Sequence, residues 1–502
     1  MTTTSNDEDP GLRMTGGDVR RLHPMSWLFV LLQQLKQFVI PLIVLLFLGR
    51  GDRNQLWSLI AVIALVVVAL WRYLTFRYRI TGDSVIIDSG VLQRSRRQVP
   101  FSRIHNVAIH QSLLHRLFGV AEVRLESAGG EKPEAEMRVL RLADAIALEA
   151  LVRRRGAIPQ AAVAPPMDDG TLLLALPVAE VLRLGLISNR GLVVLGGLAV
   201  TVSQLNPQLP NDVSIRWGKA LSLFFGSHHF SVADYAMAGT ALVLAFVVLL
   251  RLFSLLLALL QYWGFRLEEH GRRLTVERGL FTRLRTSAPR RRIQAFTLHE
   301  GVLHRLLRRR TLDVDSAVAD DRNDRRSLRE LAPIATPATC DALVRHVLPG
   351  ATWPPAHWHL LHPRAWWRLS LPGSVFSLLL ATGLCWRFGA WGLCGLSWLP
   401  WAVFVARQHA RRAGYAIDEC LVSVRAGWWS RQWRFAELDK LQALQLRQSP
   451  LDRRLGMASL WLDTAGAGGS SEALRIRYLP LQEARALHAR LGHEIARRPL
   501  HW

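Results

Sequence analysis

The chain repeats itself three times, and each copy follows directly on a pair of apolar segments. The copies begin with YRITGDSVIIDSG at Tyr78, FRLEEHGRRLTVERG at Phe265 and YAIDECLVSVRAG at Tyr415. In each copy an aromatic residue begins a segment in which apolar and polar residues alternate. A glycine and a bulky residue follow this segment, and further on a basic residue stands directly before an aliphatic one. A repeat of this length sets the architecture before any single residue is considered. The sequence therefore predicts a threefold array of membrane hairpin plus soluble domain.

Six apolar segments come close to the length of about 20 residues that a helix needs to cross a bilayer. They cover residues 27–48, 56–74, 181–202, 235–262, 366–386 and 390–405. Arg251 lies well inside the fourth segment. Either it faces a partner helix or a cavity, or the span ends near it with residues 252–262 at the membrane interface, and we favour the second interpretation. The fold class that follows is a multi-domain membrane protein with about six transmembrane α-helices in three hairpins.

The apolar segments and the repeats together divide the chain. The expected organisation is a polar N-terminal tail (1–26), a first hairpin (27–74), a first soluble domain (75–156), a linker (157–180), a second hairpin (181–263), a second domain (264–350), a linker (351–365), a third hairpin (366–406) and a third domain (407–502).

Charge indicates which side of the membrane the soluble domains face. The chain has 63 Lys and Arg against 39 Asp and Glu, a formal net charge of +24. Arginine runs occupy the segments that we assign to the soluble domains, whereas the loop at 203–234 has only Arg216 and Lys219. Basic residues are retained on the cytoplasmic side of membranes. We therefore expect the domains and both termini in the cytoplasm. The sequence has no recognition helix and no RNA-binding motif, so we do not expect nucleic acid as a partner.

Each soluble copy shows the pattern of a small β-domain that ends in a helix. Apolar and polar residues alternate over residues 78–87, which is typical of a half-buried strand. Helical patterns close the copies at 142–155, 336–348 and 480–498. Six or seven short strands and one C-terminal helix predict a small sandwich or partly open barrel.

Two segments of the first copy make a family resemblance specific: VPFSRIHNV at 99–107 and SLLHRLFGVAEVRLESAG at 112–129. With the aromatic start and the closing helix, they resemble the bacterial pleckstrin-homology-like family (bPH2), and the whole chain resembles the membrane-flanked proteins with tandem copies of it, the YdbT-like group. Copies two and three match these segments less closely than copy one does. The resemblance implies a pleckstrin-like split barrel after each hairpin, a place in the bacterial inner membrane, no catalytic residues, and a smaller one-domain relative as a hetero-oligomer partner.

Arginine clusters are the strongest candidates for a contact surface. The candidate residues are Arg94, Arg96, Arg97, Arg290, Arg291, Arg292 and Arg431, on or beside the predicted strand hairpins. They could contact anionic lipid head groups, each worth about 1 kcal/mol near a charged surface. They could equally serve only topology and solubility. The sequence leaves both interpretations open.

No pattern for catalysis or for a metal ion is present. The sequence has no Walker loop, GxSxG, HExxH or dinucleotide fingerprint. His105, His110 and His115 have a spacing that does not place them on one face, so the LHR turn is interpreted as local packing or capping. The histidines of HWHLLH at 357–362 lie among tryptophans and suit interfacial anchoring. We expect no cofactor, no metal and no enzymatic activity.

Three functions are compatible with these features. The first is a scaffold that recruits proteins, or assembles as a homo-oligomer or hetero-oligomer, through sheet edges and basic faces. The second is a component of membrane transport or export, which predicts polar residues along the spans, and few are present. The third is the sensing of anionic lipids. The sequence favours the scaffold.

Overall fold

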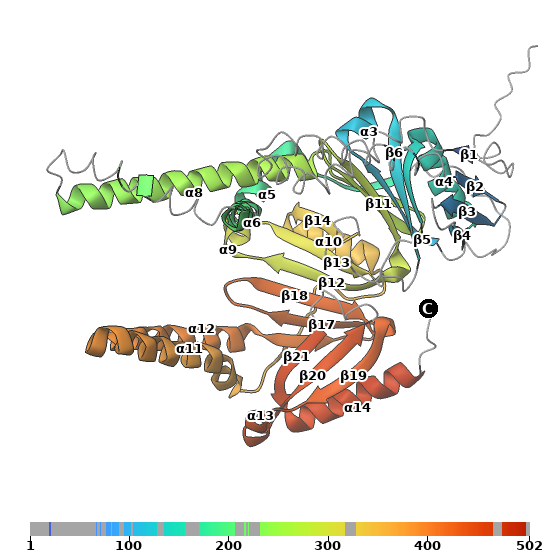
Figure 1. The fold of residues 1–502 in the computed structure, drawn as a ribbon. Helices are drawn as coiled ribbons and strands as arrows, with labels where there is room; N and C mark the ends of the chain where they lie inside the picture. Colours follow the sequence, from blue (N-terminus) through green and yellow to red (C-terminus); the bar gives the residue numbers. More distant parts are fainter. Residues whose placement is uncertain are drawn as a thin grey trace, which may run out of the picture.

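The computed structural model describes residues 20–21, 77–89 without 82, 95–127 without 102–103, 135–155, 170–205, 231–316, 328–464 and 474–497, with isolated positions at 67, 71, 215–216 and 219. The expected first hairpin (27–74) lies almost entirely outside the described residues. Figure 1 shows the β-domains stacked along one side of the molecule, with two sets of apolar helices projecting from them in the same direction.

The first domain contains two groups of antiparallel strands and a closing helix. Its elements are β1 (Arg20–Arg21), β2 (Arg77–Ile80), β3 (Ser84–Ser89), β4 (Ser95–Pro100), β5 (Ile104–Gln111), α3 (Leu113–Leu117), β6 (Val120–Ser127), β7 (Ala135–Arg141) and α4 (Leu142–Arg155). Strands β2 to β4 form one group, and β5 to β7 the other. The inner faces of the two groups and α4 share one apolar core.

The second domain follows the same order, with helices after its first strand. Its elements are β8 (Thr171–Ala175), α5 (Val178–Ile187), α6 (Arg190–Leu205), α8 (Val232–Tyr262), β9 (Arg266–His270), β10 (Arg273–Arg278), β11 (Arg283–Pro289), η3 (Arg290–Arg292), β12 (Ile293–Glu300), α9 (Val302–Leu306), β13 (Arg310–Ser316), β14 (Glu330–Ala335) and α10 (Pro337–Val347).

The third domain repeats this arrangement. Its elements are β15 (His359–Leu360), α11 (Ala365–Phe388), η4 (Gly389–Ser397), α12 (Trp398–Arg412), β16 (Gly414–Ile417), β17 (Leu421–Ala426), β18 (Arg431–Glu437), η5 (Leu438–Lys440), β19 (Leu441–Arg447), α13 (Pro450–Arg454), β20 (Met457–Thr464), β21 (Leu474–Pro480) and α14 (Leu481–Arg497).

The apolar helices are inserted between the first and second strands of a sheet. Strand β8 precedes the helices of the second domain and pairs with β9, which follows them. Strand β15 pairs in the same way with β16, across α11 and α12. The segments 157–180 and 351–365, expected as linkers, therefore contribute β8 and β15 to the sheets. Both ends of each helical insertion are held at the same sheet edge.

The sheets do not stop at the domain boundaries. One seven-stranded sheet has the order β7-β6-β5-β11-β10-β9-β8, and a second has the order β14-β13-β12-β18-β17-β16-β15. Each joins the last three strands of one domain to the first four of the next. The sequence predicts three separate β-domains, whereas the structure shows that neighbouring domains share their sheets (Figure 1).

The prediction of six spans is not met in the described residues. Two stretches there are long and apolar enough to cross a membrane, 236–262 and 365–412, and a third is possible if α5 and α6 form one span. The expected span at 181–202 is broken, because α5 and α6 are separate helices bent by 58°. Helix α8 continues unbroken through Arg251 to Tyr262, so that span does not end at the arginine as expected.

The second apolar stretch folds back into a hairpin, so the expected fifth and sixth spans form its two arms. Glycines permit the close approach of α11 to η4 and α12: a Cβ at Gly395 would lie 2.8 Å from the backbone nitrogen of Ala381, and one at Gly373 would lie 2.7 Å from the Cβ of Ala402. Ser377 Oγ donates a hydrogen bond of 2.9 Å to the carbonyl of Gly395.

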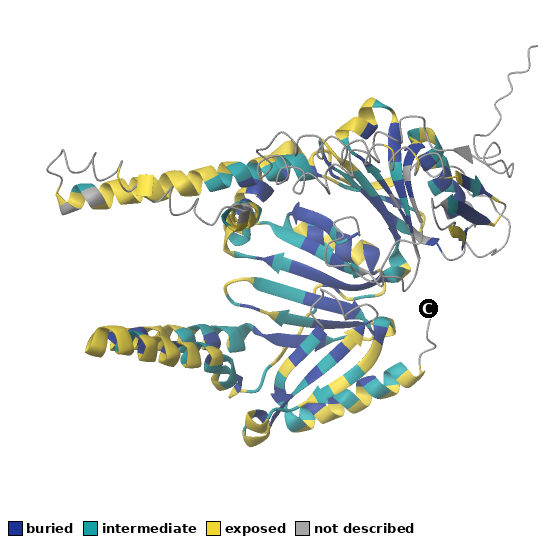
Figure 2. Ribbon diagram, viewed as in Figure 1, coloured by how far each residue is buried: buried dark blue, intermediate teal, exposed yellow. Residues whose placement is uncertain are grey.

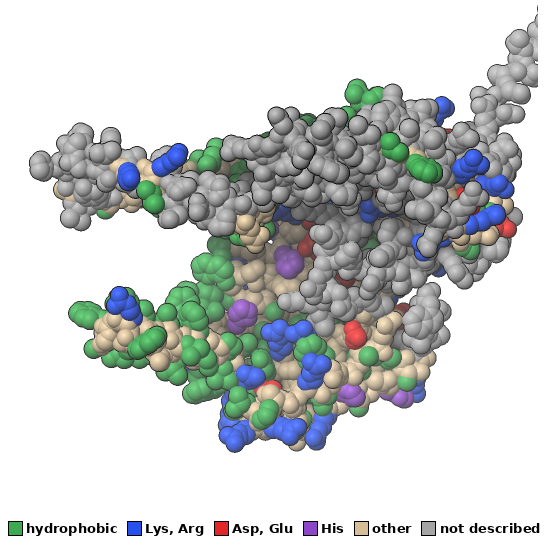
Figure 3. Space-filling model, in the orientation of Figure 1, with side chains coloured by type: hydrophobic (Ala, Val, Ile, Leu, Met, Phe, Trp, Pro, Cys, Tyr) green, Lys and Arg blue, Asp and Glu red, His purple; other side chains and the backbone are tan. Residues whose placement is uncertain are grey.

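Apolar side chains cover the outside of these helices. Leu242 on α8 and Leu379 on α11 are 69% and 66% exposed. Figure 2 shows most of α8, α11 and α12 as exposed, and Figure 3 shows the apolar side chains gathered along the hairpin of α11 and α12. Helices that expose leucine along their length to this extent are suited to lipid rather than to water.

A stacked aromatic pair lies at the boundary between the second and third domains. Phe296 of β12 and Phe435 of β18 stack with ring centroids 5.4 Å apart, and both are buried. Phe435→Ala is expected to destabilise the protein by about 3–5 kcal/mol, because it leaves a cavity inside the shared sheet. Thermal unfolding in detergent checks this, with Phe281→Ala as a control because Phe281 is 48% exposed. Equal midpoints for the two variants would contradict the prediction.

Candidate functional site: shared and open sheet edges

The first domain boundary is a backbone ladder supported by arginine. Strand β11 pairs antiparallel with β5, with Arg283 opposite Gln111 and Thr286 opposite Ala108. Arg116, which follows His115 in the LHR turn, donates from Nη1 to the carbonyl of Leu280 at 2.8 Å. This carbonyl lies in the β10–β11 turn of the next domain, so the arginine reaches across the boundary beside the paired strands.

The second boundary is built in the same way. Strand β18 pairs antiparallel with β12, with Arg431 opposite Glu300 and Phe435 opposite Phe296. Arg305, the equivalent of Arg116 in the repeat, donates from Nη2 to the carbonyl of Trp429 at 2.9 Å. From its sequence alone, the LHR turn is interpreted as local packing or capping. His115 does take part in a local cap with Ser112, but the neighbouring arginine holds the next domain.

Both boundaries use one register. Counted from the repeated glycines at 90, 279 and 427, Arg283 and Arg431 occupy equivalent positions, and so do Gln111 and Glu300. These residues face each other at both boundaries. The pairing of neighbouring domains is therefore a property of the repeated unit rather than of one pair of strands.

Ion pairs reinforce the second boundary. Arg431 lies 3.3 Å from Glu300, and Arg434 Nη2 lies 2.6 Å from the Asp315 carboxylate. Arg431, predicted as a lipid or partner contact, is thus engaged with a neighbouring domain of its own chain. Arg434 was not predicted, although its place three residues after a repeated arginine was a usable signal.

One strand edge at each end of the array lacks a strand partner among the described residues. Strand β4 pairs only with β3, and β19 pairs only with β20. Their equivalents inside the array, β11 with β18 and β5 with β12, are the strands that join the domains. The array therefore ends in two complementary edges.

Burial shows the difference between a joined and an open edge. Seven of the eight residues of β12 are buried, whereas only Leu441 is buried in the equivalent strand β19. Residues 95–98 of β4 are all exposed, whereas β18 has no fully exposed residue. Exposed strand edges present unpaired backbone groups that a further strand can satisfy.

Two of the predicted arginines lie on the open edge β4. Arg96 is 67% exposed at its side chain and lies 3.8 Å from Asp88, and Arg97 is adjacent to it. Arg94 lies outside the described residues. The structure thus places Arg96 and Arg97 on an exposed sheet edge, and their contact with lipid or with a partner stays a prediction.

The run from Arg290 to Arg292 forms the short turn η3 before β12. Arg290 lies 2.7 Å from Glu269 and donates to the carbonyl of His346 at the end of α10. Burial, with repulsion from Arg291 and Arg273, lowers the pKa of the Arg292 guanidinium to about 10. Lys440 Nζ of the third domain donates to the Arg291 carbonyl at 2.7 Å. The run therefore connects elements of two domains.

A buried charge cluster joins the second domain to its apolar helices, and sequence reasoning missed it. Glu330 of β14 accepts from Arg190 at 3.0 Å, from Arg278 at 2.5 Å and from the Tyr262 hydroxyl at 2.6 Å. Burial alone would raise the pKa of the Glu330 carboxyl, but Arg278 and Arg190 outweigh it and hold the pKa below its ordinary value. Arg190 and Tyr262 come from α6 and α8, so the cluster anchors both helices.

Arg251 has a structural contact inside the same insertion. Its Nη1 donates to the carbonyls of Leu186 and Ser188 at 3.0 and 3.2 Å and to Asn189 Oδ1 at 3.2 Å. The guanidinium therefore satisfies carbonyls at the C-terminal end of α5, where the chain turns into α6. No group of three His, Cys, Asp or Glu side chains in the described ranges is placed to hold a metal ion.

The Glu330 cluster gives a stability prediction. Glu330→Gln leaves Arg278 and Arg190 without a counter-charge, so we expect a loss of about 3–5 kcal/mol. Because the folded-state pKa is depressed, the contribution of Glu330 is present above its ordinary value of 4.5 and is lost as the pH falls through the folded value. Thermal unfolding between pH 3 and 7 checks this. Glu277→Gln, at a half-exposed pair with Arg283, is the control.

Comparisons with known proteins agree with the repeated architecture. The bacterial PH domain family matches residues 30–156, 221–338 and 368–495, which together are well over half of the chain. The UPF0699 transmembrane protein YdbT of Bacillus subtilis (strain 168) is 22% identical over 458 residues, covering 87% of this chain and 90% of that protein. No solved structure matches the chain. The chain therefore belongs to the bacterial PH domain family, as a membrane protein with three copies of the domain.

Proposed function

We propose that this protein is a non-catalytic membrane scaffold whose three PH-like domains face the cytoplasm and assemble with further copies, edge to edge. One observation carries the proposal. The chain joins its own domains by pairing a strand equivalent to β19 with a strand equivalent to β4, and in the described part of the chain β4 and β19 themselves have no strand on their outer edges.

The register of the assembly follows from the two internal boundaries. With the same register, β4 of one chain would pair antiparallel with β19 of the next, with Ser95 opposite Arg447, Arg96 opposite Leu446 and Arg97 opposite Gln445. Addition of a strand to an open edge is a common mode of protein recognition, because backbone hydrogen bonds supply the attraction.

A side-chain contact supports the same partner. Arg453 of α13 is the third member of the series formed by Arg116 and Arg305, and it is exposed. The first two members donate to a carbonyl in the β-turn of the following domain. In the proposed assembly Arg453 would reach the corresponding turn, between β3 and β4, of a second copy.

An interface of this kind is head to tail rather than two-fold. Because β4 and β19 are different surfaces, repeated pairing gives a ring if the rotation closes and a filament if it does not. Helix α8 and the α11–α12 hairpin project in one direction, which favours growth in the plane of the bilayer (Figure 1). A one-domain PH-like membrane protein would carry both edges and fit the same positions, as the hetero-oligomer partner expected from the sequence.

Disulfide trapping between two chains tests this assembly. In a background with Cys340, Cys385, Cys394 and Cys420 replaced by alanine, Ser95→Cys in one chain and Arg447→Cys in a differently tagged chain are expected to crosslink in cell membranes. Directly opposite residues of an antiparallel pair have Cα atoms about 4.5–5.5 Å apart, within reach of a disulfide.

The control pairs Ser95→Cys with Gln442→Cys, which is displaced by five residues, or about 16 Å along the strand. Crosslinking of the first pair alone supports the register. A monomer without adducts, or equal adducts from both pairs, would overturn the assembly.

A further inference from the structure

A cavity of about 580 Å³ lies at the base of the α11–α12 hairpin in the third domain. Its walls come from the hairpin, from β16 to β18 and from β21. The lining includes Trp398, Trp401 and Val405 of α12, with Leu369 of α11. These residues belong to the apolar stretch that is suited to a membrane, so one end of the cavity is apolar and continuous with the hairpin.

The cavity extends far along the hairpin. Its lining on the α12 side runs from Trp398 to Ala413, which corresponds to about 22 Å of helix at 1.5 Å per residue. One leaflet of the hydrocarbon core is about 15 Å thick. The space is therefore long enough to hold an acyl chain that enters from the bilayer.

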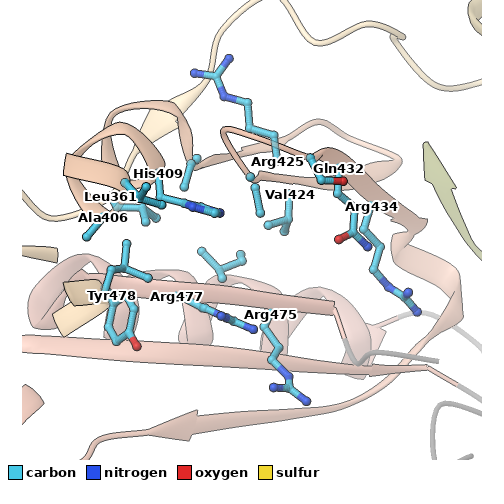
Figure 4. Close-up of a pocket in the computed structure, with 18 of the residues that line it drawn as sticks. Leu361, Ala406, His409, Val424, Arg425, Gln432, Arg434, Arg475, Arg477 and Tyr478 are labelled. Atoms are coloured by element: carbon cyan, nitrogen blue, oxygen red, sulfur yellow. The ribbon is translucent and has the colours of Figure 1, made fainter. Parts of the chain in front are cut away.

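The other end of the cavity is basic. The lining of the cavity contains Arg425, Arg434, Arg475 and Arg477, with His409 nearer the apolar end, and among the described residues that line it there is no carboxylate. In Figure 4, Leu361 and Ala406 lie at one end, and Arg434 lies at the other. Arg475 and Arg477 follow β21 along one rim, and Arg425 extends outward from the opposite rim. A negative group at this mouth would meet guanidinium groups on both sides.

Two of the rim arginines are held in place by aromatic rings. The Arg425 guanidinium lies 4.8 Å from the centre of the Trp358 ring, and that of Arg475 lies 3.7 Å from the centre of the Trp461 ring. Burial lowers the pKa of Arg425, and its buried Nε has no hydrogen-bond partner among the residues that the structure describes. Stacking on aromatic rings fixes the positions of both guanidinium groups at the rim of the cavity.

In the second domain, protein side chains occupy positions equivalent to part of this cavity. The repeat makes Val276, Arg278, Leu284 and Thr286 equivalent to the cavity residues Val424, Ala426, Gln432 and Arg434. At these four positions only about 10 Å³ remains, because Arg278 binds Glu330 and Tyr262 covers the pair. A separate space of about 300 Å³ is also lined by Arg278, and its lining includes the carboxylate residue Glu277. The second domain supplies its own carboxylate to its arginines, whereas the third domain lacks both the filling arginine and the carboxylate.

We propose that the cavity between the α11–α12 hairpin and the β-strands of the third domain binds an anionic phospholipid from the surrounding bilayer, with an acyl chain along α12 and the phosphate at Arg475 and Arg477. The charge of the rim selects the head group, and the apolar end selects the chain. The site does not depend on the scaffold, since it lies within one domain of one chain.

Photo-labelling of the full chain tests this site. The protein is placed in nanodiscs that contain mainly phosphatidylcholine, with a minority of phosphatidylglycerol whose acyl chain carries a diazirine. Labelled peptides are expected from residues 361–413 and from β17. The same diazirine on phosphatidylcholine is expected to label these peptides several-fold less. An excess of water-soluble glycerol phosphate should not compete, because it lacks the acyl chain; complete competition would mean that the site takes a soluble phosphate, which would overturn the lipid.

Two variants separate the rim from the cavity. Arg475→Gln with Arg477→Gln should reduce phosphatidylglycerol labelling several-fold, whereas Arg485→Gln with Arg490→Gln on the exposed face of α14 should not. Val424→Trp fills the apolar space and should reduce labelling by both lipids, and Val424→Ile should not. Unchanged thermal unfolding shows that each variant is folded. Equal labelling by the two lipids, or wild-type labelling of the rim and filled variants, would overturn the proposal.

Discussion

Backbone pairing between neighbouring domains is the constraint on which the rest of the structure depends. A PH-like domain of this size has short sheets, and each sheet leaves edges that must be paired, covered or exposed. Here β5 and β12 satisfy their outer edges with β11 and β18 of the next domain. Each boundary adds a clamp from Arg116 or Arg305, and the second adds the stacked rings of Phe296 and Phe435. The domains are consequently joined by shared β-sheets and are not independent units connected by flexible linkers.

The membrane helices are fixed to this structure at both of their ends. Strand β8 enters and β9 leaves the second insertion side by side, and Glu330 binds arginine and tyrosine from the helices themselves. The third insertion has the same strand pairing through β15 and β16, but a cavity remains where the second has its charge cluster. The two copies thus differ at the base of their helices: the second domain is closed there by its own charged residues, whereas the third domain has an open cavity.

The sequence predicts the repeat unit well and the relations between units poorly. Alternation and apolar length predict the strands, the closing helices and the position of the helical insertions, because these properties are local. The partner of an edge strand is not local: nothing in the pattern of β18 distinguishes a solvent-facing edge from one that meets β12. Arg431 is therefore recognised as a contact residue but not as one half of an ion pair within the chain, and Glu330, a single carboxylate at the start of a short strand, gives no signal. The two-residue strand β15 is too short to be recognised.

The insertion of the helices between paired strands has a consequence for biosynthesis. As the chain leaves the ribosome, β8 appears before α5, and its partner β9 appears only after α8 is complete. The sheet edge that holds β8 can form only when the apolar segment has been placed so that its two ends return to the same point. Completion of each sheet is then coupled to the insertion of its own helices, and a copy whose helices fail to insert would present an unfinished sheet to the quality-control machinery of the cell.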